Sequence, residues 1–175
     1  MIVGLDLSLT GLGMAAVPPD WDLDWKHVQT HRVSCPLPRN ATLRQQTDRL
    51  RSLALDCRVF AVRVGATHVW GEDLPTARAF NLVSLGELRG AVRLELLREC
   101  GLDLHFAPQS SVRKFLLGRL PRKDRKAHVV EALKAAGANF GSDDECDAFA
   151  VANWGLSEIG APCMAGLLWT SGTAA

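Results

Sequence analysis

The first 17 residues, MIVGLDLSLTGLGMAAV, decide how the rest of the chain is interpreted. Residues 2–7 are apolar apart from one carboxylate, Asp6, and they predict a buried strand. A short turn with Ser, Thr and Gly follows, and GLGMAAV (11–17) predicts the antiparallel partner of that strand. A lone acid at a strand end either caps a turn or binds a ligand at the rim of the sheet. The second interpretation requires further acids that reach the same rim.

The remaining elements extend this strand pair into a single α/β domain. A third strand is expected over 26–33, so the chain opens with three antiparallel strands. Apolar spacing then predicts a helix starting at Leu43, strands over 66–72 and 102–106, and helices over 82–97, 109–117, 124–136 and 143–156. This order predicts a mixed five-stranded sheet, three antiparallel strands followed by two parallel ones, flanked by helices. That is the layout of the RNase H-like fold. The domain is expected to span 1–158, with 159–175 as a C-terminal tail.

Composition limits the class of protein. The chain has 175 residues, is 47% hydrophobic and 22% charged, and carries a net charge of +1, which favours one globular domain over a disordered or generally cationic protein. Its five cysteines are scattered and never form a CxxC pair, so a structural zinc or a disulfide framework is not expected. No run reaches the roughly 18 apolar residues of a membrane span. We therefore expect a cytoplasmic protein with no membrane attachment.

Two further places carry acids that can reach the rim near Asp6. Glu72 ends the fourth expected strand, so its side chain lies at the edge of the sheet. The segment GSDDECDAFAVA (141–152) opens the last expected helix. Its Asp144 and Asp147 are separated by three residues and are therefore neighbours on one helix face. The same stripe continues through apolar residues that face the core, so both aspartates are expected to point toward the sheet.

Helix capping explains only some of these acids. Ser142 and Glu145 have the spacing of a capping box, and acids in a first turn suit the helix dipole. That accounts for Asp143 and Glu145 but not for Asp147, which lies beyond the first turn. Four carboxylates on one rim need a cation, because like charges raise one another's pKa. Oxygen ligands without nearby His or Cys favour Mg²⁺ or Mn²⁺, and a pair of such ions is typical of phosphodiester hydrolysis.

Four segments together resemble a known family: DLSLTGLG (6–13), WGEDL (70–74), NLVSLGELRGAV (81–92) and the D-x-x-D-A-x-A-x-A pattern (144–152). Their order and spacing over residues 1–155 are similar to those of RuvC-type Holliday junction resolvases. The resemblance implies a Mg²⁺-dependent homodimer that nicks opposing strands of a four-way DNA junction, with Mn²⁺ as a substitute ion. It assigns metal binding and catalysis to the acids already identified: Asp6, Glu72, Asp144 and Asp147.

Basic residues and one loop complete the predicted site. The stretch VRKFLLGRLPRKDRKAHV (112–129) concentrates positive charge, which favours contact with DNA phosphates. The residues assigned to DNA binding are Arg113, Lys114, Arg122, Lys123 and Lys126, together with Phe80 as a candidate for insertion at the junction centre. Lys126 is also assigned to catalysis, because its amino group can neutralise charge that develops on the scissile phosphate. The loop after Glu72 is longer than in cellular bacterial resolvases, which fits a phage or mobile-element version.

The acids alone leave alternatives open. Other RNase H-like nucleases act on forks, flaps or hybrids, and a junction-binding module without cleavage would share the fold, although the complete set of acids argues against it. A second basic group is interpreted as solvated surface, with contact to a junction arm as the alternative: Arg39, Arg44, Arg49 and Arg51. Trp21, Trp25 and Trp169 are candidates for a dimer interface. Gly86 and Gly90 would let the helix over 82–97 approach either the sheet or a second subunit.

Overall fold

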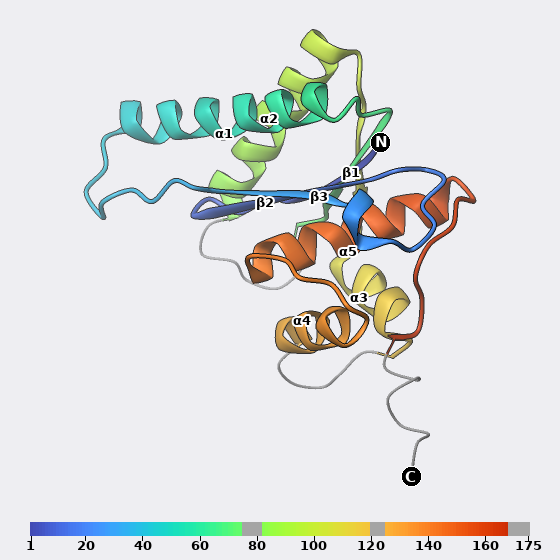
Figure 1. Ribbon diagram of the computed structural model, residues 1–175. Helices are drawn as coiled ribbons and strands as arrows, with labels where there is room; N and C mark the ends of the chain where they lie inside the picture. The colour runs from blue at the N-terminus through green and yellow to red at the C-terminus, as the bar shows by residue number, and fades with distance from the viewer. Residues whose placement is uncertain (75–81, 120–124, 168–175) are drawn as a thin grey trace.

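The computed structural model describes residues 1–74, 82–119 and 125–167. Within these residues a mixed five-stranded sheet lies between two layers of helices (Figure 1). The strands are β1 (Ile2–Asp6), β2 (Gly11–Val17), β3 (Gln29–Ser34), β4 (His68–Glu72) and β5 (Leu104–Ala107). The helices are α1 (Leu43–Arg63), α2 (Leu82–Cys100), α3 (Gln109–Leu117), α4 (Arg125–Ala135) and α5 (Asp143–Glu158). Each predicted helix and strand is therefore present.

The sheet has the strand order β3-β2-β1-β4-β5. The β1–β2 and β2–β3 pairs are antiparallel, whereas the β1–β4 and β4–β5 pairs are parallel. β1 lies in the centre and has a neighbour on each side, which explains why residues 2–5 are apolar and buried. The predicted fold class, an RNase H-like mixed sheet flanked by helices, is confirmed.

The third strand begins later than the sequence predicted. A 3-10 turn occupies Trp25–His27, and β3 starts at Gln29. The side chain of Asp24 caps this turn by accepting a hydrogen bond from the backbone N–H of Lys26 at 3.0 Å. Because an Asp side chain can satisfy nearby backbone donors in this way, it offers the backbone an alternative to strand pairing.

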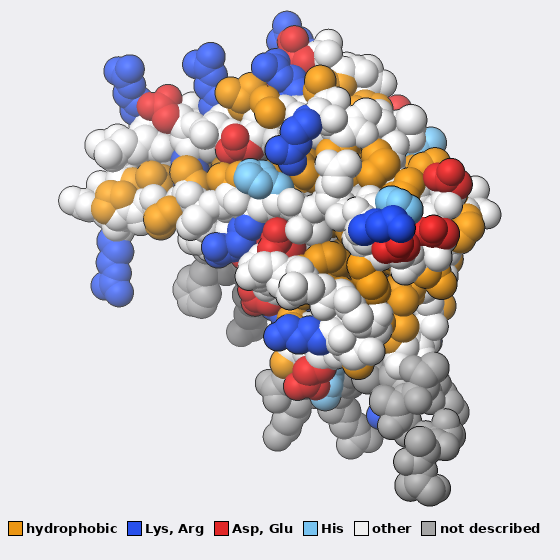
Figure 2. All heavy atoms as spheres, in the orientation of Figure 1, with side chains coloured by type: hydrophobic (Ala, Val, Ile, Leu, Met, Phe, Trp, Pro, Cys, Tyr) orange, Lys and Arg blue, Asp and Glu red, His pale blue; other side chains and the backbone are white. Residues whose placement is uncertain are grey.

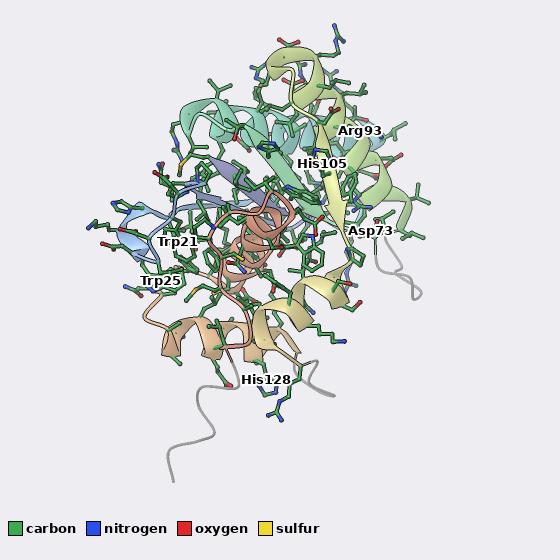
Figure 3. The ribbon with its side chains drawn as sticks, turned by 90° about the vertical axis from the view of Figure 1, so that its right-hand side faces the viewer. Trp21, Trp25, Asp73, Arg93, His105 and His128 are labelled. Carbon is green, nitrogen blue, oxygen red and sulfur yellow. The ribbon has the colours of Figure 1, made fainter. Side chains whose placement is uncertain are left out.

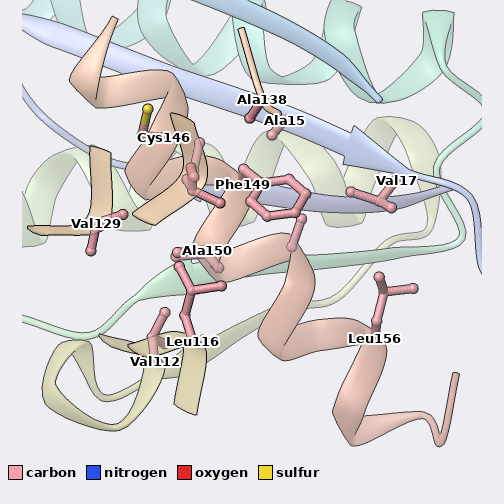
Figure 4. Packing of buried hydrophobic residues seen from close by; sticks show 14 of the residues in the cluster. Ala15, Val17, Val112, Leu116, Val129, Ala138, Cys146, Phe149, Ala150 and Leu156 are labelled. Atoms are coloured by element: carbon pink, nitrogen blue, oxygen red, sulfur yellow. The ribbon is translucent and has the colours of Figure 1, made fainter. Parts of the chain in front are cut away.

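Helices α1 and α2 cover one face of the sheet, and α3, α4 and α5 cover the other (Figure 1). The core on the α5 side is built around Phe149, which packs among aliphatic side chains of β2, α3 and α4 (Figure 4). Trp21 and Trp25 belong to this core, with ring centroids 5.5 and 5.2 Å from that of Phe149 (Figure 3). Trp21, which is 1% exposed, is therefore a core residue, whereas a place for the partly buried Trp25 at a dimer interface stays a prediction. Trp169 lies outside the described residues.

Glycines allow α5 to lie directly on the sheet. A Cβ atom at Gly4 would overlap the backbone of Ala148, and one at Gly13 would overlap the backbone carbonyl of Asp144. The position of the first turn of α5 is thus fixed by β1 and β2. By contrast, a Cβ atom at Gly86 or Gly90 would meet no described atom within 4 Å, so these glycines do not serve contact with the sheet. Their role at a second subunit stays a prediction.

The segment after α5 folds back along that helix. The side-chain amide of Asn153 donates to the carbonyl of Met164 and its oxygen accepts from the Met164 N–H, both at 2.8 Å. Cys163, Met164 and Leu167 pack against the core of α5. Within the described ranges, no helix combines the length and the apolar character needed to cross a membrane.

Candidate active site

Asp6 and Glu72 lie next to each other at one edge of the sheet. β1 and β4 are parallel neighbours in which Leu5 is paired with Gly71, so the following residue of each strand carries its carboxylate to the same rim. The Asp6 side chain is only 14% exposed. Gln109, at the start of α3, donates from Nε2 to Glu72 Oε2 at 2.7 Å and thereby orients this carboxylate.

The first turns of α5 bring Asp144 and Asp147 to the same edge. Ser142 caps the helix as predicted, because its hydroxyl accepts a hydrogen bond from the backbone N–H of Glu145 at 3.2 Å. The carboxylate of Asp144 is so close to β2 that a Cβ atom on Gly11 would lie 2.6 Å from its Oδ2. The Asp147 side chain is 4% exposed. Both aspartates therefore face the sheet, as the stripe on the helix predicted.

The amino group of Lys126 lies among these acids. Its Nζ is 3.0 Å from Asp144, 3.4 Å from Asp147 and 3.9 Å from Asp6, and Asp143 is 3.3 Å away on the outer side. Lys126 is at the start of α4, so two helices and two strands supply the lysine and the four acids. The lysine holds the carboxylates around one positive charge and reduces their mutual repulsion.

Burial and crowding alter the pKa of three of the acids. Burial raises the pKa of Asp6 well above its ordinary value, and the charges of Glu72 and Asp147 add to the effect. Burial likewise raises the pKa of Glu72, with a further contribution from Asp147. Burial also raises the pKa of Asp147, although nearby cations oppose the change. A cation placed beside any of these three carboxylates would therefore stabilise its ionised form.

Asp144 behaves differently because two cations hold it. Burial acts to raise its pKa, but hydrogen bonds from Arg32 and Lys126 outweigh burial and lower it. The Arg32 Nε lies 2.7 Å from Asp144 Oδ2, and Lys126 takes the other oxygen. Burial acts to lower the pKa of Lys126 in turn, yet the bond to Asp144 and the other acids raise it overall. Lys126 is thus held in its charged form.

The structure separates the residues predicted to bind DNA. Arg113 is buried and its Nη2 lies 3.2 Å from Asp147 Oδ2, so it balances charge inside the cluster. Lys114, the next residue, is exposed on α3. Arg122, Lys123 and Phe80 lie outside the described residues. A contact of these side chains with DNA stays a prediction.

Besides Gln109, a second residue that the sequence analysis did not identify lies beside Glu72. Arg89 on α2 donates to the backbone carbonyl of Glu72 and, at 3.2 Å, to Asp73 Oδ1. Its guanidinium group lies 3.9 Å from the centre of the Phe106 ring, and the side chain is 11% exposed. Asp73 is seen directly after β4 in Figure 3. A cavity of about 200 Å³ opens here, between the end of β4 and α2, and reaches Asp6.

These residues fit a divalent cation. The Oδ1 atom of Asp147 is buried and accepts no hydrogen bond from the described residues, which leaves a ligand atom available inside the cluster. All four donors are carboxylates, the ligand type that Mg²⁺ and Mn²⁺ prefer. Among the described residues, Asp22, Asp24 and His27 bring their ligand atoms within 4.8 Å of one another, but this group lies at the surface, where acidic groups are common without an ion. The cluster at the sheet edge is therefore the better candidate.

Comparisons by sequence find no match, either among protein-family models or among curated proteins. Solved structures do match. Thermus thermophilus RuvC aligns with a TM-score of 0.66 over 91% of this chain and 96% of that chain, at 17% identity. This chain has the RuvC fold. T. thermophilus RuvC in complex with Holliday junction substrate aligns with a TM-score of 0.68 over 91% of this chain and 97% of that chain, at 18% identity.

The RuvC fold confirms, at the level of architecture, the resemblance seen in the four sequence segments. One of those segments begins at the last residue of β1, a second includes the end of β4, and a third lies in the first turns of α5. They are far apart in the sequence but adjacent at the acidic edge of the sheet. The fold therefore explains why acids at these three places come together.

Proposed function

We propose that this protein is a structure-selective DNA endonuclease that resolves four-way junctions with bound Mg²⁺, for which Mn²⁺ can substitute. The observation that carries the proposal is the convergence of Asp6, Glu72, Asp144 and Asp147 on one edge of a sheet with the RuvC fold. The choice of a four-way junction as substrate rests on the likeness to RuvC bound to Holliday junction substrate.

In this proposal the four acids hold the metal. Divalent ions at such a site supply an activated water and stabilise the leaving oxygen of a phosphodiester. Gln109 keeps Glu72 in place through its 2.7 Å hydrogen bond. Arg113 offsets the charge of Asp147 from inside the protein. Lys126, half exposed at the mouth of the cluster, donates to the scissile phosphate and offsets its developing negative charge.

The proposal includes a homodimer and a basic DNA-binding surface. Two opposing strands are cut by two active sites, and one chain supplies one site. Exposed apolar side chains on α1 and α2 support association: Leu55, Val59, Val62, Leu94 and Leu97. DNA contact is assigned to Lys114 and Lys126, to Arg113 beside the cluster, and to Arg122, Lys123 and Phe80.

The test compares a labelled four-way junction with duplex, fork and flap DNAs of matched sequence. Each is incubated with Mg²⁺, with Mn²⁺ and with EDTA, using the parent protein, Asp6→Asn and a control, Glu131→Gln. Glu131 is an exposed acid on α4 that pairs only with His128 among the described residues. We expect symmetric nicks in the junction with either ion, retained by Glu131→Gln and lost in EDTA and in Asp6→Asn.

Two other results would replace this proposal. Cleavage that prefers forks or flaps would keep the metal centre and change the substrate class. Tight binding of the junction without cleavage in either ion would identify a binding module and not an enzyme.

A further inference from the structure

Four arginines at the start of α1 form a positive surface that the proposed active site does not use. This α1 arginine surface consists of Arg39, Arg44, Arg49 and Arg51. Arg39, Arg44 and Arg51 are exposed and Arg49 is half-buried, and Lys and Arg side chains project from this edge of the molecule in Figure 2. Only one acid, Asp48, lies between residues 39 and 51.

The charge on this surface is almost unpaired. Arg44 lies 3.8 Å from Asp48, and both side chains are highly exposed, so the pair contributes little. No ion pair joins Arg39, Arg49 or Arg51 to an acid of the described residues. Further along α1 the situation reverses, because Arg58 pairs with Glu95 at 2.8 Å and with Glu99 at 3.8 Å.

Arg44 also lies at the wrong end of α1 for helix stability. The N-terminus of a helix favours acids and disfavours cations, because of its unsatisfied N–H groups and the helix dipole. The first turn of α1 carries no acid, and Arg44 is its second residue. A capping box at Thr42 and Gln45 stabilises the helix start instead. The positive charge therefore needs an explanation outside the helix.

This surface is connected to the acidic edge by β3. Ser34, the last residue of β3, is paired with Gly11, whose Cβ position lies 2.6 Å from Asp144 Oδ2. Residues 35–42 then carry the chain from this edge to the start of α1. In Figure 1 the start of α1 and the first turn of α5 lie on the same side of the molecule, at the left. Arg32 on β3 lies between them and pairs with Asp144 at 2.7 Å.

A second positive surface lies on the opposite face of the sheet. Lys114 and Arg119 are exposed on and just after α3, on the face that α5 covers, whereas α1 covers the other face. The acidic cluster is at the edge between the two. A single continuous duplex that crosses the cluster needs contact with only one of these surfaces. Two surfaces on opposite faces suit two DNA segments that diverge from the cleaved position.

We propose that the α1 arginine surface binds the phosphate backbone of a second duplex arm of the branched substrate. This inference rests on the proposed function and specifies how that substrate is held. Arg44 and Arg51 are seven residues apart on one face of α1, a rise of about 10.5 Å. That distance covers about three base-pair steps, so both side chains can contact one DNA backbone. Such contacts add affinity without sequence preference.

The experiment varies arm length and charge together. Junctions with arms of about 20 base pairs are compared with junctions whose arms are shortened to about half a helical turn and closed by hairpin loops, so that they stay paired. Binding is measured in EDTA over a series of salt concentrations for the parent and for Arg44→Gln/Arg51→Gln. The matched control, Arg93→Gln/Arg98→Gln, removes the same charge from two exposed arginines of α2 (Arg93 is labelled in Figure 3).

For the long-armed junction we expect the Arg44→Gln/Arg51→Gln variant to lose about tenfold or more in affinity. Its slope of log K against log salt should be smaller by about 2, because each phosphate contact contributes about 0.9. Binding of the short-armed junction should be unchanged, and the α2 control should match the parent on both. Thermal melting should show no loss of stability in the variant, since both side chains are exposed, the Arg44–Asp48 pair contributes little and the charge of Arg44 opposes the helix dipole.

Two outcomes would overturn the inference. Unchanged affinity and salt slope on long arms would show that the surface does not contact the substrate. An equal loss on short-armed junctions, or on a linear duplex of the same length, would show a general DNA contact and not a second arm. Failure of the proposed function is a separate result, since it is measured as an absence of metal-dependent cutting of the short-armed junction by the parent.

Discussion

Lys126 lets a crowded acidic cluster exist in a folded chain that holds no metal. Its ammonium group contacts three of the four predicted ligands, and its elevated pKa keeps it charged. The compensation is incomplete at Asp6, whose pKa stays well above its ordinary value because of burial and neighbouring acids. The ionised form of Asp6 is therefore unfavourable in the metal-free protein, and an ionised Asp6 lowers the stability of the fold.

Replacing Asp6 should separate activity from stability. We expect Asp6→Asn to lower the cleavage rate by a hundredfold or more, since loss of even an outer-shell partner of a metal typically costs about 10–100-fold. We also expect a higher melting temperature for the metal-free protein at neutral pH, by roughly 2–4 °C for each kcal/mol of relieved repulsion. Cleavage assays and calorimetric melting in EDTA provide the two measurements.

The gain in stability expected for Asp6→Asn should depend on pH, in a direction that follows from the raised pKa of Asp6. The raised pKa of Asp6 means that the folded chain binds its proton more tightly than the unfolded chain does. Parental stability therefore falls as pH rises from the unfolded pKa through the folded pKa, whereas the Asn variant lacks this loss. The gain should vanish in acid, where Asp6 is protonated in both states. A gain of equal size in acid would contradict this explanation.

Arg89 should act as a positioning residue for Glu72. Its guanidinium group binds the Glu72 carbonyl and Asp73 while stacking on Phe106, and a lysine amino group lacks the planar fork to do all three. We expect Arg89→Lys to weaken Mn²⁺ binding about tenfold in titration calorimetry. Arg93→Lys, an exposed change one turn further along α2, should bind Mn²⁺ as the parent does. Equal affinities for both variants would leave Arg89 a purely structural role.

The four acids could be predicted from local patterns, but not all of their partners could. Asp6 and Glu72 stand at strand ends, and helical spacing sets Asp144 beside Asp147. Arg32 meets Asp144 only because β3 pairs with β2, and no local signal in the sequence marks that contact. The burial of Arg113 did leave a signal, since it shares the apolar stripe of α3 with Leu116 and Leu117.

At the scale of elements, the contact between α5 and the sheet decides where two of the four acids lie. The helix is placed by the bare backbone at Gly4 and Gly13, which leaves no room for a side chain. The strand and helix patterns predicted that both elements exist and which face of α5 is buried. They did not specify the close approach, because it depends on which glycines face one another after folding.

Adding one methyl group at this contact should disturb both fold and site. Gly13→Ala places a Cβ atom against the backbone of Asp144, and overpacking of this kind typically costs about 1–3 kcal/mol. We expect lower thermal stability together with weaker Mn²⁺ binding. Gly90→Ala is the matched change on α2, where the space is open, and should raise the stability of the monomer by up to about 1 kcal/mol. Equal melting temperatures for the two variants would refute this account.

At the scale of the whole molecule, the outer faces of α1 and α2 should hold two copies together. Val62 and Leu94 are 65% and 61% exposed. We expect Val62→Glu/Leu94→Glu to shift sedimentation toward monomer, with Ile159→Glu, on the other side of the sheet, as the control. On a plasmid that extrudes a four-way junction, the parent should make two cuts and yield linear product. A variant that no longer dimerises should make one cut and yield nicked circles. If a protein that sediments as a monomer still yields linear product, the prediction that paired cutting requires a dimer is wrong.

The placement of half of the acidic cluster on α5 has a consequence for synthesis. A nascent chain exposes Asp6 and Glu72 early, while Asp144 and Asp147 emerge only with the helix that also completes the core around Phe149. Under the proposed function, the fold and the complete metal site are therefore acquired in the same late step. A product that stops before α5 lacks two of its four acids, so under the proposed function an interrupted translation leaves no active nuclease.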